Sequence, residues 1–328
     1  MAPGLNKRYL PQQEIFNNAY LQKDSLKNLN KIIKTNANEN EQETVQKNYN
    51  NHLLAELYSF SDSSGIDFQF FNLFYKREGI TKDIDLGVDA GIFTIEKEDY
   101  NRYRGKRYGV SLFYKNLQLR LGKNDFDDFS QVVPSIFYKN SYKKHSYSLQ
   151  YTYQNALFYT YTLAPYEKRI NAHHISISDY ITLKNQKNIW ANIQINHFDN
   201  SDTELTAQFD WRFFYDSLFH PKFSYDFALE GWYTSHTKEN SDFYSPSFAD
   251  ATLLRIDPHY LLNKYFGIRA TLGTGYSFSD QQMPYKYGLW IFGNPLKRLS
   301  YSAGCLRSNA SRGNYEYDEC RASMEYKW

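Results

Sequence analysis

Apolar and polar residues alternate along much of this chain. Between Glu204 and Asp216 every odd position is apolar or aromatic: Leu205, Ala207, Phe209, Trp211, Phe213 and Tyr215. Most residues between them are polar, and 222-236 repeats the arrangement. Successive side chains of a β-strand point to opposite faces, so these runs predict strands with one apolar face and one wet face.

Counting back from Trp328, the pattern predicts sixteen strands. They lie near 64-76, 83-95, 106-114, 117-123, 131-139, 143-153, 155-163, 172-183, 187-198, 203-215, 222-233, 250-260, 266-278, 285-293, 298-308 and 316-328. Fourteen or eighteen strands are alternatives, because the weak region 106-123 fits one long strand or two short ones. Closed bacterial barrels usually have an even number of strands, which places both chain ends in the periplasm.

We therefore expect an all-β fold, a transmembrane antiparallel β-barrel of about sixteen strands, with a short N-terminal helical segment. The barrel is expected to span 64-328. A soluble β-sandwich is the competing architecture, because its strands also alternate. Its buried faces would not hold so many tyrosines.

The last strand carries a recognisable pattern. Met324, Tyr326 and Trp328 are apolar, and Glu325 and Lys327 between them are polar. A chain that stops on an aromatic residue in this way resembles the Gram-negative outer-membrane β-barrel proteins. The resemblance implies that Met324, Tyr326 and Trp328 form an assembly signal read by the barrel assembly machinery. It also implies a place in the bacterial outer membrane, in contact with lipid and lipopolysaccharide.

Composition agrees with a membrane barrel. The chain has 31 Tyr and 24 Phe, yet its mean hydropathy is −0.69. Lipid-facing positions and aromatic rims account for the aromatics, and a wet lumen accounts for the polarity. No stretch approaches the roughly 18 apolar residues of a helical span. A net charge of +2 gives no reason to expect a nucleic-acid partner.

Residues 1-60 differ from the rest of the chain. Glu14 to Ile33 has a helical spacing of apolar residues, and 35-51 is rich in Asn, Gln and Glu. We expect a periplasmic helical segment, linker or plug, which could dock a periplasmic partner. The beginning of the sequence lacks the apolar core of a secretory signal, so we expect the natural N-terminus to lie before Met1.

Two short segments resemble parts of known exporters. Phe243-Tyr-Ser-Pro-Ser-Phe248 at a strand start, and the helical piece Asn18 to Leu26, are similar to features of tetratricopeptide-repeat exopolysaccharide export proteins of the cellulose and poly-N-acetylglucosamine systems. That resemblance implies a sixteen-stranded export barrel behind a helical solenoid. Several complete repeats are missing, and Pro246 also fits an ordinary strand start.

One face of the predicted strands gathers charged and aromatic residues. Its lumen-lining candidates are Asp85, Asp89, Trp190, Glu204, Asp210, Arg212, Asp226, Glu230, Trp232, Arg269, Lys286 and Trp290. Hydrated charges and flat rings suit a carbohydrate conduit, and an exopolysaccharide is the expected cargo. The alternatives are a general porin whose charges pair with one another, and an outer-membrane anchor that docks a periplasmic assembly.

Nothing in the sequence predicts an enzyme, a cofactor or a metal site. The pairs His145-Ser146 and His173-His174 lack the oriented third group of a catalytic triad. The acidic stretch 125-128 lacks the glycine and glutamate of an EF-hand. The basic run 102-107 could meet lipid phosphates or acidic cargo, or be a solvated turn.

Cys305 and Cys320 are the only cysteines. They flank a turn-like segment, so a symmetric hairpin would place them opposite one another, where a disulfide can form. We expect this bond near the external rim. Two free buried thiols are the alternative.

Overall fold

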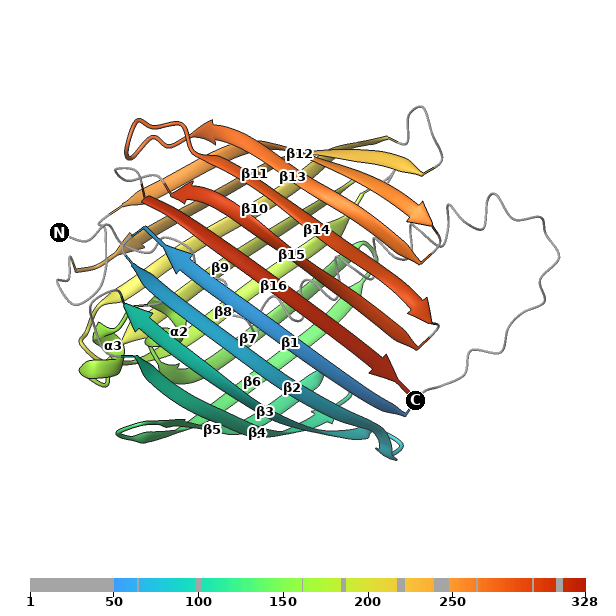
Figure 1. Cartoon of the computed structure of the whole chain (residues 1–328). Helices are drawn as coiled ribbons and strands as arrows, with labels where there is room; N and C mark the ends of the chain where they lie inside the picture. Colours follow the sequence, from blue (N-terminus) through green and yellow to red (C-terminus); the bar gives the residue numbers. More distant parts are fainter. Residues whose placement is uncertain are drawn as a thin grey trace.

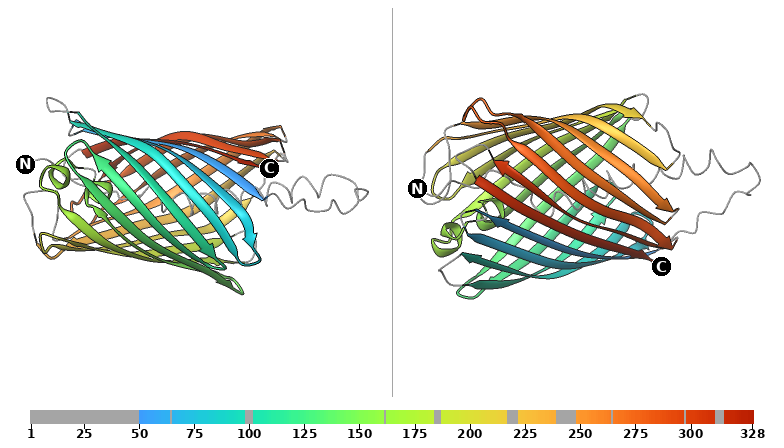
Figure 2. Two further views of the ribbon diagram at one scale, coloured as in Figure 1. Left: turned by 90° about the horizontal axis from the view of Figure 1, so that it is seen from below. Right: turned by 45° about the horizontal axis from the view of Figure 1, so that its top comes forward.

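Sixteen antiparallel strands close into one barrel in the computed structural model (Figure 1). The structure describes residues 50-328 apart from 64, 98-101, 161, 184-186, 217-221, 239-247, 264, 297 and 311-314. Two further views show the strands running obliquely around the barrel wall (Figure 2). Over these residues, the predicted fold class is confirmed.

The strand bounds follow the chain order. They are β1 Asn51–Asp62, β2 Ile66–Thr81, β3 Ile84–Lys97, β4 Tyr103–Tyr114, β5 Leu117–Phe126, β6 Ser130–Tyr142, β7 His145–Asn155, β8 Asn171–Thr182, β9 Asn188–Phe198, β10 Thr203–Asp216, β11 Phe223–His236, β12 Ala249–Asn263, β13 Phe266–Tyr276, β14 Tyr285–Leu296, β15 Leu299–Ala310 and β16 Tyr315–Lys327. Two short helices, α2 Leu157–Thr160 and α3 Ala164–Glu167, lie between β7 and β8.

The first and last strands close the barrel. β1 pairs with β2 on one side and with β16 on the other, in a continuous antiparallel register from His52↔Lys327 to Asp62↔Tyr317. Asn51 and Trp328 also exchange backbone hydrogen bonds of 3.1 and 3.0 Å. Pairing on both edges of every strand leaves no open sheet edge, which a bilayer would not tolerate.

The strand count is sixteen as expected, but two individual predictions were wrong and offset each other. Residues 51-62 were placed in the N-terminal segment, yet they form β1, so the barrel begins before residue 64. The spacing of their apolar residues does not by itself indicate a strand. Residues 51-62 form one because they pair with β2 and with β16, which is distant in the sequence. The N-terminal helical segment expected before them lies outside the described residues.

The other wrong prediction is the strand at 155-163. Leu157, Phe158 and Tyr159 are consecutive and all buried, which a strand with one lipid face cannot achieve. They form α2 instead, and Pro165 lies in the first turn of α3. The uncertain region 106-123 holds two strands, β4 and β5.

The outer surface carries a belt of exposed apolar side chains. Members on β3 to β5 include Val88, Val110 and Leu121, which are 49%, 58% and 60% exposed. Exposed aromatics flank the belt near both ends, with Tyr114, Tyr142 and Trp328 at the end that holds the chain termini. Such a belt with aromatic girdles is the lipid-facing surface of a membrane barrel. Within the described part of the chain, no helix is long and apolar enough to cross a membrane.

The disulfide prediction is confirmed. Cys305 and Cys320 face each other in the register of β15 and β16, and a disulfide joins them. They lie on the outer face near the middle of both strands, so the expected position at the external rim was wrong. Five further residues of each strand, up to Ala310 and back to Tyr315, lie between the cysteines and the hairpin turn.

Candidate functional site: the barrel lumen

The polar face of the strands points into the barrel. Opposite the exposed apolar residues lie buried polar ones, such as Asn192 and Gln194 on β9 and Glu230 on β11. The alternation places all the lumen-lining candidates on this inner face, at Asp85, Asp89, Trp190, Glu204, Asp210, Arg212, Asp226, Glu230, Trp232, Arg269, Lys286 and Trp290. Their role as cargo contacts stays a prediction.

One side of the lumen is a charged wall, which we define as Asp210, Arg212, Asp226, Glu230, Arg255, Asp257, Arg269 and Lys286 on β10 to β14. At its centre, Arg255 Nη1 lies 2.6 Å from Asp210 Oδ2 and 2.8 Å from Glu230 Oε2. Arg255 Nε lies 2.8 Å from Asp257 Oδ2. One guanidinium therefore contacts carboxylates from three strands.

The outer parts of the charged wall extend this pairing. Lys286 Nζ lies 2.5 Å from Glu230 Oε1, and Arg212 Nε lies 3.3 Å from Asp226 Oδ2. Arg269 stacks over the ring of Trp290, with 5.4 Å between its guanidinium carbon and the ring centroid. Sequence reasoning missed Arg255 and Asp257, although both lie on the polar side of a predicted strand, and that alternation was the signal available.

A second charged group lies across β3 to β5. Arg120 donates to Asp89 through two nitrogens, at 2.8 and 2.6 Å. Arg107 Nε lies 4.0 Å from Asp89 Oδ2, and its guanidinium packs over the ring of Phe70. The sequence identified Asp89 but neither arginine. Arg120 was not singled out in the strand predicted at 117-123, and Arg107 belongs to the basic run 102-107, which was treated as a turn. In the structure it enters β4 and alternates, so that Arg107 faces inward and Lys106 outward.

A neutral wall on β6 to β9 lies beside the charged wall, between it and the second charged group. We define it as the inward-facing hydroxyl and amide residues Ser135, Ser148, Gln150, Thr152, Ser176, Ser178, Asn192 and Gln194. They bond one another: Ser148 and Ser178 hydroxyls lie 2.7 Å apart, and the Ser176 hydroxyl donates to Asn192 Oδ1 over 2.9 Å. Such groups can both donate and accept, as sugar hydroxyls do. Sequence reasoning missed this wall.

A group of hydrogen-bonded histidine and acidic side chains lies beside the neutral wall, at the end of the barrel away from the termini. His174 Nδ1 lies 2.7 Å from Asn196 Oδ1, and Asn196 donates to Glu204 over 2.8 Å. His236 Nδ1 lies 2.7 Å from Asp202 Oδ2. Burial alone would raise the pKa of Asp202, but hydrogen bonds from His236, the Lys238 backbone and Thr237 outweigh it and lower that pKa.

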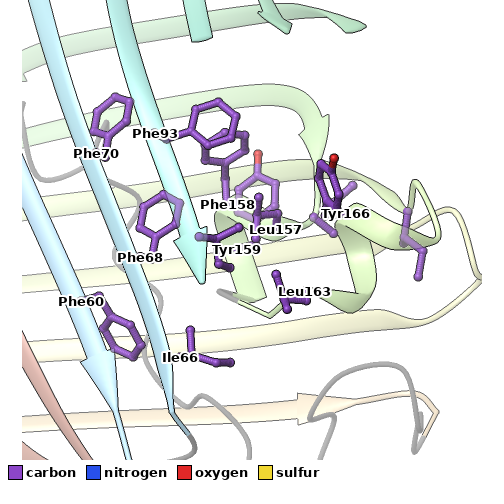
Figure 3. Close-up of a cluster of buried hydrophobic side chains, with 14 of the residues drawn as sticks. Phe60, Ile66, Phe68, Phe70, Phe93, Leu157, Phe158, Tyr159, Leu163 and Tyr166 are labelled. Carbon is purple, nitrogen blue, oxygen red and sulfur yellow. The ribbon is translucent and has the colours of Figure 1, made fainter. Parts of the chain in front are cut away.

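The connection between β7 and β8 folds into the barrel mouth at this same end (Figures 1 and 3). It forms an apolar mouth cluster, which we define as Phe60, Ile66, Phe68, Phe70, Phe93, Leu157, Phe158, Tyr159, Leu163 and Tyr166. The ring of Phe158 lies 5.1 Å from that of Phe93. Phe158 also contacts the rings of Phe68 and Phe126, so helix α2 packs against the inner faces of β2, β3 and β5 and narrows the lumen on that side.

The other sequence candidates lie apart from the lumen centre. His145 pairs with Asp179 on the outer face, at 2.7 Å, and His173 and His174 point to opposite faces. Among the described residues, no group of three or more His, Cys, Asp or Glu side chains is placed to hold a metal ion. The motif around Tyr244-Ser-Pro246 and the helical piece Asn18 to Leu26 lie outside the described residues.

Comparisons with known proteins agree on the fold. No protein-family model matches the chain, and no curated protein matches it. Among solved structures, it is similar to a "Bacterial polysaccharide outer membrane secretin", with a TM-score of 0.67 and 12% identity over 86% of this chain and 100% of that one. It is also similar to CdiB from Acinetobacter baumannii, with a TM-score of 0.52 and 9% identity over 84% of this chain and 60% of that one.

At such identities the likeness shows the fold alone. The closed barrel, its apolar outer belt and its polar interior together define the chain as an outer-membrane β-barrel, and its place is the bacterial outer membrane.

Proposed function

We propose that the barrel is a passive conduit for carbohydrate across the outer membrane, with an exopolysaccharide as its cargo. The neutral wall is the observation that carries this proposal. It offers a continuous series of hydroxyl and amide groups along the lumen, and Trp190 on the neighbouring inward face of β9 supplies a flat ring. The barrel with the TM-score of 0.67, described as a polysaccharide secretin, supports the same cargo class.

The charged wall complements this use. Its carboxylates and cations bind one another, as Arg255 does with Asp210, Glu230 and Asp257. A wall whose charges are paired presents little net field to passing solutes. An uncharged polymer would then be held by the neutral wall and would pass the charged wall without strong attraction. We propose no enzymatic activity for the barrel.

The connections suggest the orientation. At the end that holds the termini they are short, at 82-83, 115-116 and 143-144. At the opposite end they include the long segments 156-170 and 237-248. Outer-membrane barrels have short periplasmic turns and longer external loops. We therefore infer that Asn51 and Trp328 lie on the periplasmic side and that the mouth cluster lies outside.

Planar-bilayer recordings test the function. We expect neutral oligosaccharides to interrupt the ion current, with residence times that lengthen as the oligosaccharide grows. Asn192→Ala should shorten those residence times, because it removes a hydrogen-bonding amide from the neutral wall. Arg307→Gln, a change on the outer face, is the matched control and should leave them unchanged.

A general porin is the second candidate, because the internal pairing of charges also suits an unselective lining. It predicts that sugars, amino acids and salts pass with no residence time that depends on length or on Asn192. A barrel that carries no current would contradict both conduit functions and favour the anchor that docks a periplasmic assembly.

A further inference from the structure

Two successive rows of inward-facing residues cross β1 to β5 near helix α2. The register places the members of each row opposite one another on neighbouring strands. The row nearer the mouth, the apolar row, consists of Tyr58, Phe70, Phe93, Gly105 and Phe126. Two residues further from the mouth on each strand is the polar row, which we define as Glu56, Asn72, Gly91, Arg107 and Asn124.

Helix α2 lies on the apolar row. The ring of Phe158 lies 5.1 Å from that of Phe93 and 6.3 Å from that of Phe126 (Figure 3). The next residue of the helix, Tyr159, stacks on the ring of His174 on β8 at 4.9 Å. Its hydroxyl also interacts electrostatically with Arg107 of the polar row. The helix therefore lies between the mouth and the polar row.

The polar row contains hydrogen-bonding atoms that have no partner among the described residues. Asn124 is fully buried, and neither its Nδ2 nor its Oδ1 forms a hydrogen bond. Arg107 is 3% exposed, and its Nε and Nη2 form none, although Nε lies 4.0 Å from Asp89 Oδ2. The Oδ1 atom of buried Asn72 is likewise unbonded. A buried polar atom without a partner costs free energy, so a row of them indicates a place where a ligand can bond.

The chemistry of this row fits an uncharged ligand with hydroxyl groups. Its unbonded atoms include both donors and acceptors, and a hydroxyl group can serve both. The charges around the row balance, because Arg107 and Arg120 face Asp89 and Glu56. An anion would gain little from a group without net charge. The ring of Phe70, 5.4 Å from the Arg107 guanidinium carbon, adds a flat apolar surface.

We propose that the polar row is a binding subsite for a neutral carbohydrate, and that α2 covers this subsite until the carbohydrate displaces the helix. The proposal rests on the carbohydrate cargo proposed above and locates one place where the barrel binds it. The contacts of Phe158 hold the helix over the row. When the helix moves, sugar hydroxyls bond the Asn124 amide and the Arg107 guanidinium, which have no such partners in the covered form.

Asn124→Leu tests the binding role, because it replaces the unbonded amide with an apolar side chain of similar shape. Removing a buried polar group that has no partner is neutral or stabilising, so the unfolding midpoint should stay the same or rise. Residence times of neutral oligosaccharides in planar-bilayer recordings should shorten by roughly tenfold, as expected when two hydrogen bonds are lost.

Asn196→Leu is the matched control for stability. Asn196 is equally buried, but it contacts His174 and donates to Glu204, so this change should lower the unfolding midpoint. If Asn124→Leu lowers the midpoint as much and leaves residence times unchanged, the polar row is structural and the proposal is wrong.

A single thiol tests whether α2 covers the row. Cys305 and Cys320 are bonded to each other, so Asn124→Cys introduces the one free thiol of the chain. A water-soluble methanethiosulfonate should modify it slowly. Adding Phe158→Ala, which removes the ring packed on the apolar row, should speed the reaction at least about tenfold, equivalent to about 1.4 kcal/mol of lost closure. Equal rates would show that α2 does not cover the row.

The recordings also separate this proposal from the proposed function. Interruptions that Asn192→Ala shortens and Asn124→Leu does not would contradict the subsite alone. If no oligosaccharide interrupts the current of the unmodified barrel, both the carbohydrate function and the subsite are wrong.

Discussion

The charged wall and the neutral wall meet at β10, yet they stabilise the lumen in different ways. In the charged wall, Arg255 binds three carboxylates contributed by β10, β11 and β12, so the loss of one partner disturbs several strands. In the neutral wall, each contact joins two uncharged groups on the same or neighbouring strands, as Ser148 does with Ser178. Lumen water can replace such a neutral contact at little cost, but it replaces a charge pair less completely.

This difference suggests that one wall stabilises the barrel and the other binds cargo. Charges that are committed to one another add rigidity and leave little attraction for cargo. Hydroxyl and amide groups are held more weakly, so a sugar hydroxyl can exchange for a neighbouring side chain. We infer that the charged wall serves mainly as structure and that the neutral wall serves mainly as the binding surface.

The first prediction has the largest expected effect on stability. It tests whether both walls face the water-filled lumen rather than lipid. Phe209 and Gln208 are adjacent on β10, where the walls meet, and Phe209 points outward with 37% exposure. Phe209→Arg places a charge in lipid and should lower the free energy of unfolding by roughly 2 to 4 kcal/mol near the midplane. Gln208→Arg should be mild. Urea titration in vesicles measures both, and a reversed order would mean that the faces are exchanged.

The second prediction concerns the centre of the charged wall. Arg255→Met keeps the side-chain stem and removes the cation, which leaves Asp210, Glu230 and Asp257 to repel one another. In a dry interior such a loss costs about 3 to 5 kcal/mol, and we expect about 2 kcal/mol here because lumen water screens the carboxylates. Arg255→Lys should recover part of the loss. An unfolding midpoint that does not change with Arg255→Met would show that the three-carboxylate contact is not structural.

The two walls also show what sequence can reveal. Strand periodicity predicted the barrel and most strands, because most lipid-facing residues are apolar and most lumen-facing ones are polar. It failed at 51-62, where pairing with β2 and β16 decides the structure, and at 155-163, where α2 packs into the mouth. The local alternation of apolar and polar residues does not reveal contacts between residues that are far apart in the sequence.

At the site, charged candidates such as Asp210 and Glu230 stood out because a charge in a strand is conspicuous. The serines, asparagines and glutamines of the neutral wall did not, because the same residues are common on any solvated strand. Only the closed register brings Ser176 and Asn192 into one hydrogen-bonded surface. Composition cannot separate a binding wall from an ordinary polar face.

The third prediction gives the neutral wall a charge. Asn192→Asp keeps the shape of the side chain and the acceptor that Ser176 uses, but it adds a carboxylate without a cation beside it. We expect a stability loss of about 0.5 to 1 kcal/mol and a shift of the reversal potential toward cation selectivity in a salt gradient. Asp210→Asn should shift selectivity the other way and by less, because Arg255 keeps two carboxylates.

The smallest expected effect lies at the outer end of the strands that follow the neutral wall. The pKa of Asp202 is lower in the folded protein than in the unfolded chain. The stabilisation that ionised Asp202 contributes is therefore complete above its pKa in the unfolded chain, about 3.9. It is lost as the pH falls through the lower pKa of Asp202 in the folded protein. Asp202 Oδ1 accepts from the backbone N–H of Lys238 over 3.0 Å, so that amide reports the contact. Hydrogen exchange at Lys238, corrected for the intrinsic rate, should keep its protection from pH 7 to pH 5. Protection should fall only below about pH 4. Asp202→Asn should remove this acid step, and a step that survives the substitution would assign it to another group.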